Sequence, residues 1–227
     1  KKKKNYGSAA TRKFPIFLPD WWSNFPGTTR KPWERNTNKR WDGPRAFSNY
    51  ALRDTIHLIA RAFDPHTGQL ELVQIKLGDS LSSRSLTGIL QKQVDGYFDV
   101  DGHLSHDYHT KQWVYTYNYR NSFRLLDPEL KLMYTGHTLD TIARAQLRID
   151  SISKPRQHKL TGSVLVNAGT YSHKALLYVH SKVKGRYEPA KTWERTETID
   201  VYSLEDGSYR SSFYVYPEED QRLTHFL

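Results

Sequence analysis

The sequence predicts an all-β fold, on three observations. Apolar and polar residues alternate in runs that recur along the chain, as in IDVYSLEDGSYRSSFYVY at residues 199–216. A period of two is typical of strands in a sheet with one buried face. Turn dipeptides join these runs in pairs, for example Asp206-Gly207 and Asp127-Pro128. The chain also holds 15 Tyr, 9 Phe and 6 Trp, which favour strands.

A first hairpin is predicted at residues 56–77, IHLIARAFDPHTGQLELVQIKL, with its turn running from Asp64-Pro65 to Gly68. Proline presets φ at a turn position, and the aspartate before it can accept hydrogen bonds from the turn backbone. We expect this hairpin to be the outer half of a four-stranded unit.

Two further segments each predict four strands in succession. In residues 95–136, YFDVDGHLSHD and QWVYTYNYR precede the hairpin SFRLLDPELKLMY. In residues 162–216, SVLVNAGTYS and ALLYVHSKV precede the hairpin that ends the unit, with KGRYEPAKTWERTE inserted between the second and third strands. The four-strand grouping therefore repeats along the chain.

Repeated four-stranded antiparallel units are typical of the blades of a β-propeller. We expect residues 95–136 and 162–216 to pack face to face with their first strands innermost. A β-sandwich or a plain meander is the competing interpretation, because both also need many short strands. Half a blade, two blades and an opening strand at 223–227 do not close a ring, so we expect the propeller to be incomplete in this chain.

Composition narrows the function classes. A chain of 227 residues can bury a real core. It has no apolar window long enough to span a membrane and no signal-peptide pattern at its start. It contains no cysteine, which excludes disulfides and thiolate metal sites and leaves the redox compartment open.

The positive charge is concentrated at the N-terminus. Residues 1–50 hold 12 Lys or Arg and 3 Asp or Glu, whereas the other 177 residues hold 22 and 21. We interpret residues 1–45 as a basic, proline-rich extended arm and residues 46–227 as propeller blades. The arm also carries four of the six tryptophans, namely Trp21, Trp22, Trp33 and Trp41.

Three interpretations of the arm stay open. Its aromatic side chains can pack across the propeller while the basic side chains face water. They can anchor a protein partner, since tryptophan is frequent at interface centres. Basic residues interleaved with aromatic ones can also bind a polyanion, either nucleic acid or an anionic glycan.

Residues 95–142 and 166–216 resemble the uncharacterised six-bladed β-propeller proteins of Bacteroidota, and the resemblance covers about residues 46–227. It implies an exported, often lipid-anchored protein of the periplasm or outer membrane with no established reaction. The chain lacks a cysteine for a lipid, and the resemblance does not explain the basic arm. The most specific segments are Asp95-Gly96, Asp101-Gly102, Tyr117-x-Tyr119-Arg120-Asn121, Thr138-x-Asp140-Thr141 and Ile199-Asp200-Val201-Tyr202.

The segment DVDGHLSHDYH at residues 99–109 is the best candidate for a metal site. A calcium loop would need further oxygen ligands and a glutamate near its end. A zinc site does not fit an extended strand, in which His103 and His109 share one face and His106 points to the other. We expect a turn at Asp101-Gly102, and we predict neither a metal nor a cofactor.

No catalytic motif is present. The sequence has no Gly-x-Ser-x-Gly elbow and no His-Glu-x-x-His helix. The pairs Ser105-His106 and Ser172-His173 are adjacent in sequence, so their side chains point apart on a strand. Sequence alone does not place two carboxylates, such as Asp95 and Asp140, at the spacing of a glycosidase. We predict that the chain is not an enzyme and keep a hydrolase of unrecognised type as an alternative.

The segment VYTYNYRNSF predicts a tyrosine ladder, with Tyr115, Tyr117 and Tyr119 on one face. We interpret the ladder as packing between blades, with a recognition surface as the alternative. Arg120 and Asn121 end this strand, and strand ends form the rims of propellers. We therefore expect these two residues to contact a ligand or partner.

These observations predict a non-catalytic binding or scaffold protein, an exported subunit that holds another protein of an envelope complex. A polyanion-binding protein that uses the basic arm is the alternative from another class. The residues predicted to bind a partner are Trp21, Trp22, Trp33, Trp41, Arg120 and Asn121.

Overall fold

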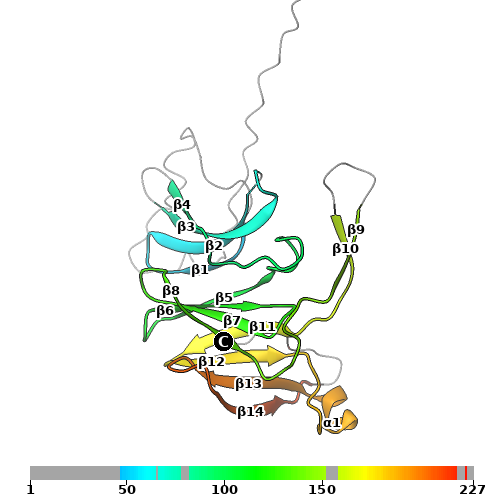
Figure 1. The fold of residues 1–227 in the computed structure, drawn as a ribbon. Coiled ribbons are helices and arrows are strands. Elements are labelled where there is room, and N and C mark those ends of the chain that lie inside the picture. Colours follow the sequence, from blue (N-terminus) through cyan, green and yellow to red (C-terminus); the bar gives the residue numbers. More distant parts are fainter. Residues whose placement is uncertain (1–46, 65, 78–81, 152–157, 219–222, 224–227) are drawn as a thin grey trace, which may run out of the picture. The chain divides into compact units, whose positions relative to one another are not determined.

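The computed structural model describes residues 47–64, 66–77, 82–151, 158–218 and 223. They form three four-stranded antiparallel sheets and one two-stranded sheet (Figure 1). Each four-stranded sheet has its strands in chain order, as a propeller blade does. The fold is therefore all-β, built from propeller blades, as predicted. The predicted arm and its four tryptophans lie outside the described residues.

The first blade is complete, which corrects one prediction. The hairpin at residues 56–77 supplies the second and third strands of this blade rather than its outer half, because a strand precedes it and another follows it. The fourth strand has the sequence SSRSL, and four of its five residues are exposed, so it carries no alternating pattern. The strands are β1 (Phe47–Leu52), β2 (His57–Asp64), β3 (Gln69–Lys76) and β4 (Ser82–Leu86).

The second and third blades confirm the predicted strand order. The insertion in the third blade lies between its second and third strands and contains α1 (Ala190–Arg195). The second blade consists of β5 (Gly102–Asp107), β6 (Gln112–Tyr117), β7 (Ser122–Leu126) and β8 (Leu132–His137). The third consists of β11 (Asn167–His173), β12 (Leu176–Ser181), β13 (Glu197–Ser203) and β14 (Tyr209–Val215).

The segment that joins the second blade to the third forms a two-stranded sheet, which was not predicted. The sheet is formed by β9 (Leu147–Ser151) and β10 (His158–Ser163), which pair in an antiparallel manner. The register shifts between Leu160 and Gly162. This irregularity and the short strands explain why no clear period marks the segment.

The blades pack face to face through two apolar layers. Between the first and second blades, Ile59 and Leu72 join a cluster with Trp113, Tyr115 and Tyr117. Strand β5 contacts both β1 and β11, so the first strands of the three blades are neighbours. The predicted interblade role is confirmed for Tyr115 and Tyr117, whereas Tyr119 lies beyond the end of β6 and is not part of this cluster.

The layer between the second and third blades is equally apolar. Val114 and Phe123 of the second blade cluster with Leu177, Val179 and Tyr202 of the third. Because Val114 and Tyr115 are consecutive on β6, they point to opposite faces of the sheet. The second blade is therefore buried on both faces, and the predicted face-to-face packing of the second and third blades is confirmed. In the described residues, no helix has the length and apolar character needed to cross a membrane.

The turn between β13 and β14 contains the predicted Asp206-Gly207 dipeptide. Gly207 has φ of +73°, its main-chain N–H donates to the Ser203 carbonyl oxygen at 2.9 Å, and a Cβ built there would lie 3.2 Å from Tyr134 Cε2. We predict that Gly207→Val lowers the free energy of unfolding by about 1–3 kcal/mol, because a β-branched residue is strained at positive φ. Chemical denaturation measures the change.

Gly207→Asn is the matched control, because asparagine tolerates positive φ better than valine. Its Cβ meets the same Tyr134 ring, so a larger loss for the Val variant is the sign of backbone strain at positive φ. Equal unfolding free energies for the wild type and the Val variant would contradict the assignment.

Candidate functional site

The predicted rim residues Arg120 and Asn121 lie in the connection between β6 and β7. The Asn118 carbonyl oxygen in this connection accepts the main-chain N–H groups of Val166, at 2.7 Å, and Asn167, at 3.1 Å. Asn167 Nδ2 in turn donates to the carbonyl oxygens of Tyr117, at 2.8 Å, and Arg120, at 3.1 Å. The connection therefore anchors the start of the third blade.

The Arg120 side chain is buried rather than presented on the rim. It is 2% exposed, and its guanidinium carbon lies 3.6 Å from the centre of the Tyr117 ring. Its Nη2 donates to the Gln91 carbonyl oxygen at 2.7 Å. A partner can reach the Arg120 side chain only if the residues that bury it move. Partner binding by Arg120 stays a prediction.

Asn121 binds the segment that follows β8. Its Nδ2 donates to the Asp140 carbonyl oxygen at 2.7 Å, and its main-chain N–H donates to the Ile142 carbonyl oxygen at 2.9 Å. The Thr138 hydroxyl donates to Asp140 Oδ2 at 2.7 Å. The two motifs around Asn121 and Asp140 thus hold each other in place.

The Asp95 to Asp99 segment is a loop that its own carboxylates hold together. Asp99 is fully buried and accepts main-chain N–H groups from Gln93, Val94, Asp95 and Gly96, the last at 2.6 Å. Burial favours the neutral form, yet these bonds and the neighbouring Asp95 hold the pKa of Asp99 below its usual range. Burial and the Asp99 carboxyl raise the pKa of Asp95. These two carboxyls stabilise the loop.

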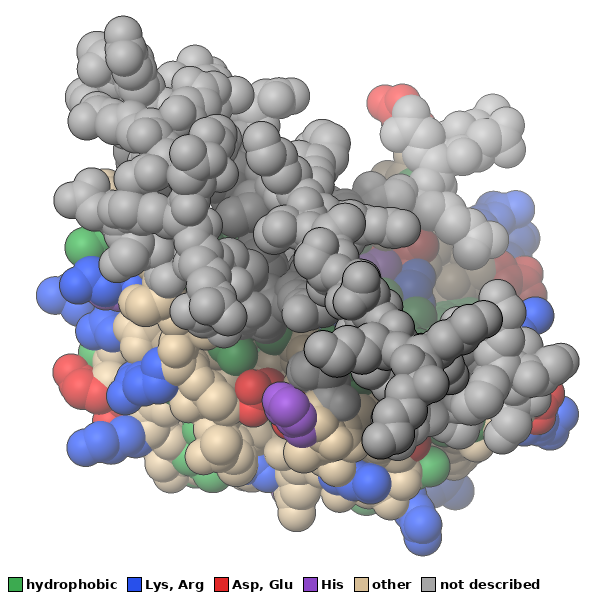
Figure 2. Space-filling model, turned by 90° about the horizontal axis from the view of Figure 1, so that it is seen from above, with side chains coloured by type: hydrophobic (Ala, Val, Ile, Leu, Met, Phe, Trp, Pro, Cys, Tyr) green, Lys and Arg blue, Asp and Glu red, His purple; other side chains and the backbone are tan. Residues whose placement is uncertain are grey.

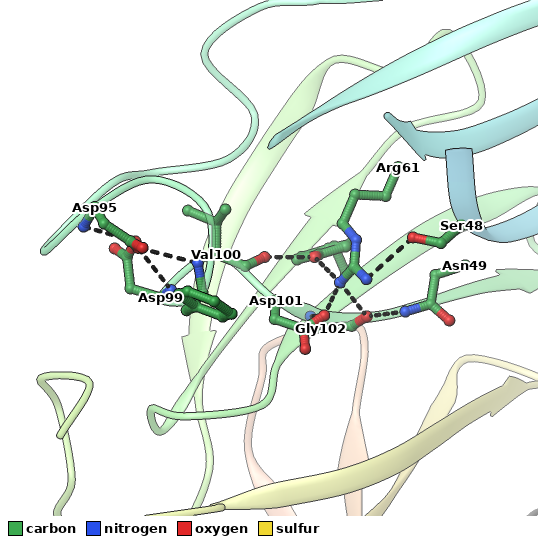
Figure 3. A network of polar contacts seen from close by, with 10 residues as sticks. Ser48, Asn49, Arg61, Asp95, Asp99, Val100, Asp101 and Gly102 are labelled. Carbon is green, nitrogen blue, oxygen red and sulfur yellow. Dashed lines mark hydrogen bonds and ion pairs between the residues drawn. The ribbon is translucent and has the colours of Figure 1, made fainter. Parts of the chain in front are cut away.

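A polar network links the first two blades (Figure 3). Arg61 on β2 forms an ion pair with Asp101 and donates to the Gly102 carbonyl oxygen at 3.2 Å. Asn49 Nδ2 donates to the same oxygen at 2.6 Å. Tyr115 donates its hydroxyl proton to the Val100 carbonyl oxygen at 2.6 Å. The Asp101-Gly102 motif therefore binds two side chains of the first blade, Asn49 and Arg61. The role of this network is to hold the two blades together.

The Asp107 carboxylate links the second and third blades. It is fully buried and accepts the main-chain N–H groups of His109, at 2.9 Å, and Thr110, at 3.4 Å. Its Oδ2 accepts the N–H of Ala175, in the β11–β12 turn, at 2.7 Å. Burial alone would raise the pKa of Asp107, but the N–H donors bring it below its ordinary value.

The three histidines of the predicted metal segment have separate surroundings. His103 and His106 lie on β5 and point to opposite faces, as predicted. His106 stacks on Trp113 with ring centroids 4.0 Å apart. His109 follows β5 and lies edge-to-face against His173, with centroids 4.7 Å apart. The described part of the chain contains no group of three or more His, Cys, Asp or Glu able to hold a metal ion.

The two serines that precede histidines in sequence bind each other. Ser105 Oγ lies 2.7 Å from Ser172 Oγ and accepts the Ser172 main-chain N–H at 2.8 Å. Both serines are buried between the second and third blades. Their hydroxyls therefore join blades and are not paired with a histidine base.

Exposed aromatic side chains gather on β14 (Tyr209–Val215) and at Tyr216, which follows it. Strand β14 pairs with β13 alone in the described part of the chain. Phe213 lies opposite Ile199, and Tyr214 lies opposite Thr198, so the two rings point to opposite faces of the blade. The signal in the sequence was the aromatic run SSFYVY at the end of the last predicted hairpin. The exposed fractions are 42% for Tyr209, 46% for Phe213, 43% for Tyr214 and 72% for Tyr216.

Neither sign of charge dominates the described part of the face drawn in Figure 2. In Figure 2, basic and acidic side chains are interspersed over the described part of the face that is drawn. This agrees with 22 basic and 21 acidic residues after Tyr50. The predicted partner residues Trp21, Trp22, Trp33 and Trp41 lie outside the described residues.

Comparison with known proteins gives a weak likeness in structure. No protein-family model matches the chain, and no protein of curated function matches its sequence. In structure the chain is similar to the β-propeller domain of Cps50 (Swd1) from Myceliophteria thermophila, with 8% identity and a TM-score of 0.31. The match covers 77% of this chain and 62% of the length of that one. A likeness at this TM-score carries no argument about function.

The Asp107 link predicts a specific dependence on pH. Since the pKa of Asp107 in the folded chain lies below its ordinary value of 3.8, the stabilisation is present above that pH and is lost as pH falls through the folded pKa. We predict that Asp107→Asn lowers the free energy of unfolding by about 1–3 kcal/mol at pH 7, because the amide leaves N–H donors unpaired. The difference in the free energy of unfolding between variant and wild type should shrink below about pH 4.

Asp127→Asn is the matched control. Asp127 Oδ1 accepts the Lys131 N–H at 2.8 Å in the exposed β7–β8 turn, within one blade. Its replacement should lower the free energy of unfolding by less than Asp107→Asn does, because only one main-chain N–H loses its acceptor. Urea denaturation at a series of pH values measures both variants, and a gap for Asp107→Asn that stays constant down to pH 2 would refute the link.

Proposed function

We propose that this chain is a non-catalytic scaffold that binds another protein through the open edge of its third blade. The observation that carries the proposal is the exposed aromatic strand β14. An edge strand presents unpaired main-chain donors and acceptors, on which a partner strand can add. Large aromatic side chains that flank such an edge supply the buried area that anchors an interface.

The half of β14 that carries Phe213 and Tyr214 has the composition of a docking edge. Natural edges are blunted with lysine, proline or bulges to prevent pairing. Strand β14 carries one basic residue, Arg210, at the register shift opposite Val201 and Tyr202. Beyond this shift the strand exposes Phe213 and Tyr214 on opposite faces. The wide exposure of aromatic rings is unfavourable in water unless a partner covers them.

The polar groups most similar to catalytic residues support a non-catalytic role. Asp99 and Asp107 each bind several main-chain N–H groups, and Ser105 binds Ser172. A catalytic acid, base or nucleophile needs a free position toward a substrate. These groups are engaged in holding loops and blades together.

The finer parts of the proposal rest on the sequence resemblance alone. They are a six-bladed ring, export to the periplasm or outer membrane, and membership of an envelope complex of Bacteroidota. The alternative function, polyanion binding, is favoured by one observation: residues 1–50 carry nearly all the excess positive charge. Binding of that kind should weaken steeply with salt, unlike an aromatic protein interface.

The test is affinity purification of the full chain from its source cells, with quantification of co-purifying proteins. The double substitution Phe213→Ser and Tyr214→Ser should reduce the yield of the partner by at least about tenfold, because it removes two exposed anchors from the edge. The fold should persist, since both side chains are nearly half exposed.

Leu132→Ser with Met133→Ser is the matched control. These residues are 42% and 52% exposed on β8, the outer strand of the second blade. The control should retain the partner. The proposal would be overturned if the β14 variant retained the partner. It would also be overturned if the partner were lost only on deletion of residues 1–45 and bound only at low salt.

A further inference from the structure

Two arginines of the second blade converge on one neutral residue. Arg120 Nη2 donates to the main-chain oxygen of Gln91, and Arg124 Nη2 donates to Gln91 Oε1, both at 2.7 Å. The Gln91 N–H donates to the Tyr117 hydroxyl oxygen at 3.1 Å. Gln91 is exposed, whereas the two arginines are 2% and 7% exposed. The two guanidinium groups are therefore buried, and each binds the exposed residue Gln91.

Neither arginine has a counter-ion among the described residues. The ion pairs found there involve other residues, such as Arg61 with Asp101. Arg61 is 8% exposed, a burial similar to that of Arg124, and it has a carboxylate partner. Burial of a charge without such a partner is strongly unfavourable. Two positive charges at one neutral residue therefore indicate a missing negative group.

Three guanidinium donors at this place are also unused. Arg120 Nε and Nη1 and Arg124 Nε are buried and have no hydrogen-bond partner among the described residues. A guanidinium presents its N–H groups in a planar fork that matches the oxygens of carboxylate and phosphate groups. Stacking on Tyr117 fixes the orientation of the Arg120 fork. The arrangement has both the charge and the donors of an anion site.

We propose that Arg120 and Arg124 form a binding site for one oxyanion, a phosphate or a carboxylate group, beneath Gln91. The anion takes the place of Gln91 Oε1 on Arg124 and receives the unused donors. Because the Gln91 side chain is exposed, it can swing into solvent without disturbing a strand. This site does not depend on the β14 edge.

Buried water is the competing occupant. Two acceptors in the β6–β7 connection, Asn118 Oδ1 and Asn121 Oδ1, also have no partner among the described residues. Water molecules can bridge such donors and acceptors. They leave the two positive charges unneutralised, however, so anion dependence separates the two occupants.

The test measures the melting temperature of the full chain in rising inorganic phosphate, with chloride used to keep the ionic strength constant. Phosphate at about ten times its Kd should raise the melting temperature by about 3–5 °C. Arg124→Gln should weaken the apparent affinity at least about tenfold by removing one charged fork.

Arg84→Gln is the matched control, because Arg84 Nη2 also donates to a glutamine, Gln74 Oε1, at 3.0 Å, but lies exposed on β4. Its response to phosphate should equal that of the wild type. Gln91→Glu places a carboxylate on the arginines within the chain. This variant should melt about 3 °C higher without phosphate and should no longer respond to it.

Acetate as a second probe identifies the source of the oxyanion. A response to phosphate alone assigns the site to a phosphoryl group, and a response to acetate as well assigns it to carboxylates such as acidic side chains. If neither probe differs from chloride, water fills the site and the proposal fails, even if Gln91→Glu stabilises the fold.

Discussion

The second blade is apolar on both faces, and the arrangement of the described blades depends on this constraint. Tyr115 and Val114 are neighbours on β6 and are both fully buried, one against the first blade and one against the third. Each such side chain contributes about 1.5–3 kcal/mol when it leaves water. Exposing either face of this sheet to water would be unfavourable, because both faces are apolar. The second blade therefore requires a neighbour on each side.

Polar groups fix how the neighbours meet. Arg61 with Asp101 joins the first two blades, and Asp107 joins the second blade to the turn of the third. Both links lie at the ends of β5, the strand that contacts the first strands of its neighbours. The carboxylates that suggest chemistry in the sequence therefore hold neighbouring blades together.

The sequence predicts the strands that carry a strong period and clear turns. Residues 112–117 and 199–203 are rich in aromatic and β-branched side chains, which favour strands, and both strands are buried almost throughout. Gly207 marks its turn through the positive φ it adopts. Strand β4 escapes prediction because its serine-rich sequence is mostly exposed and has no apolar face. Strands β9 and β10 escape because they form a small sheet with a shifted register.

The candidate sites were less predictable, because they depend on contacts between distant residues. Arg120 stood out at a strand end, yet its guanidinium is buried and binds the carbonyl oxygen of Gln91, which lies 29 positions earlier. Arg124 reads as an ordinary strand residue, and nothing local indicates that it shares Gln91 with Arg120. The exposure of Phe213 likewise requires knowing that β14 pairs with β13 alone among the described strands.

The central claim is that the outer strand of the third blade is an open edge. Amide hydrogen exchange of the isolated chain tests this claim most directly, because it reports which main-chain N–H groups are paired. The account predicts that the β14 amides pointing away from β13 exchange at least about a hundredfold faster than the amides of β6, which has a strand on each side. Equal protection of the two strands would show that the β14 edge is already paired and would contradict the account.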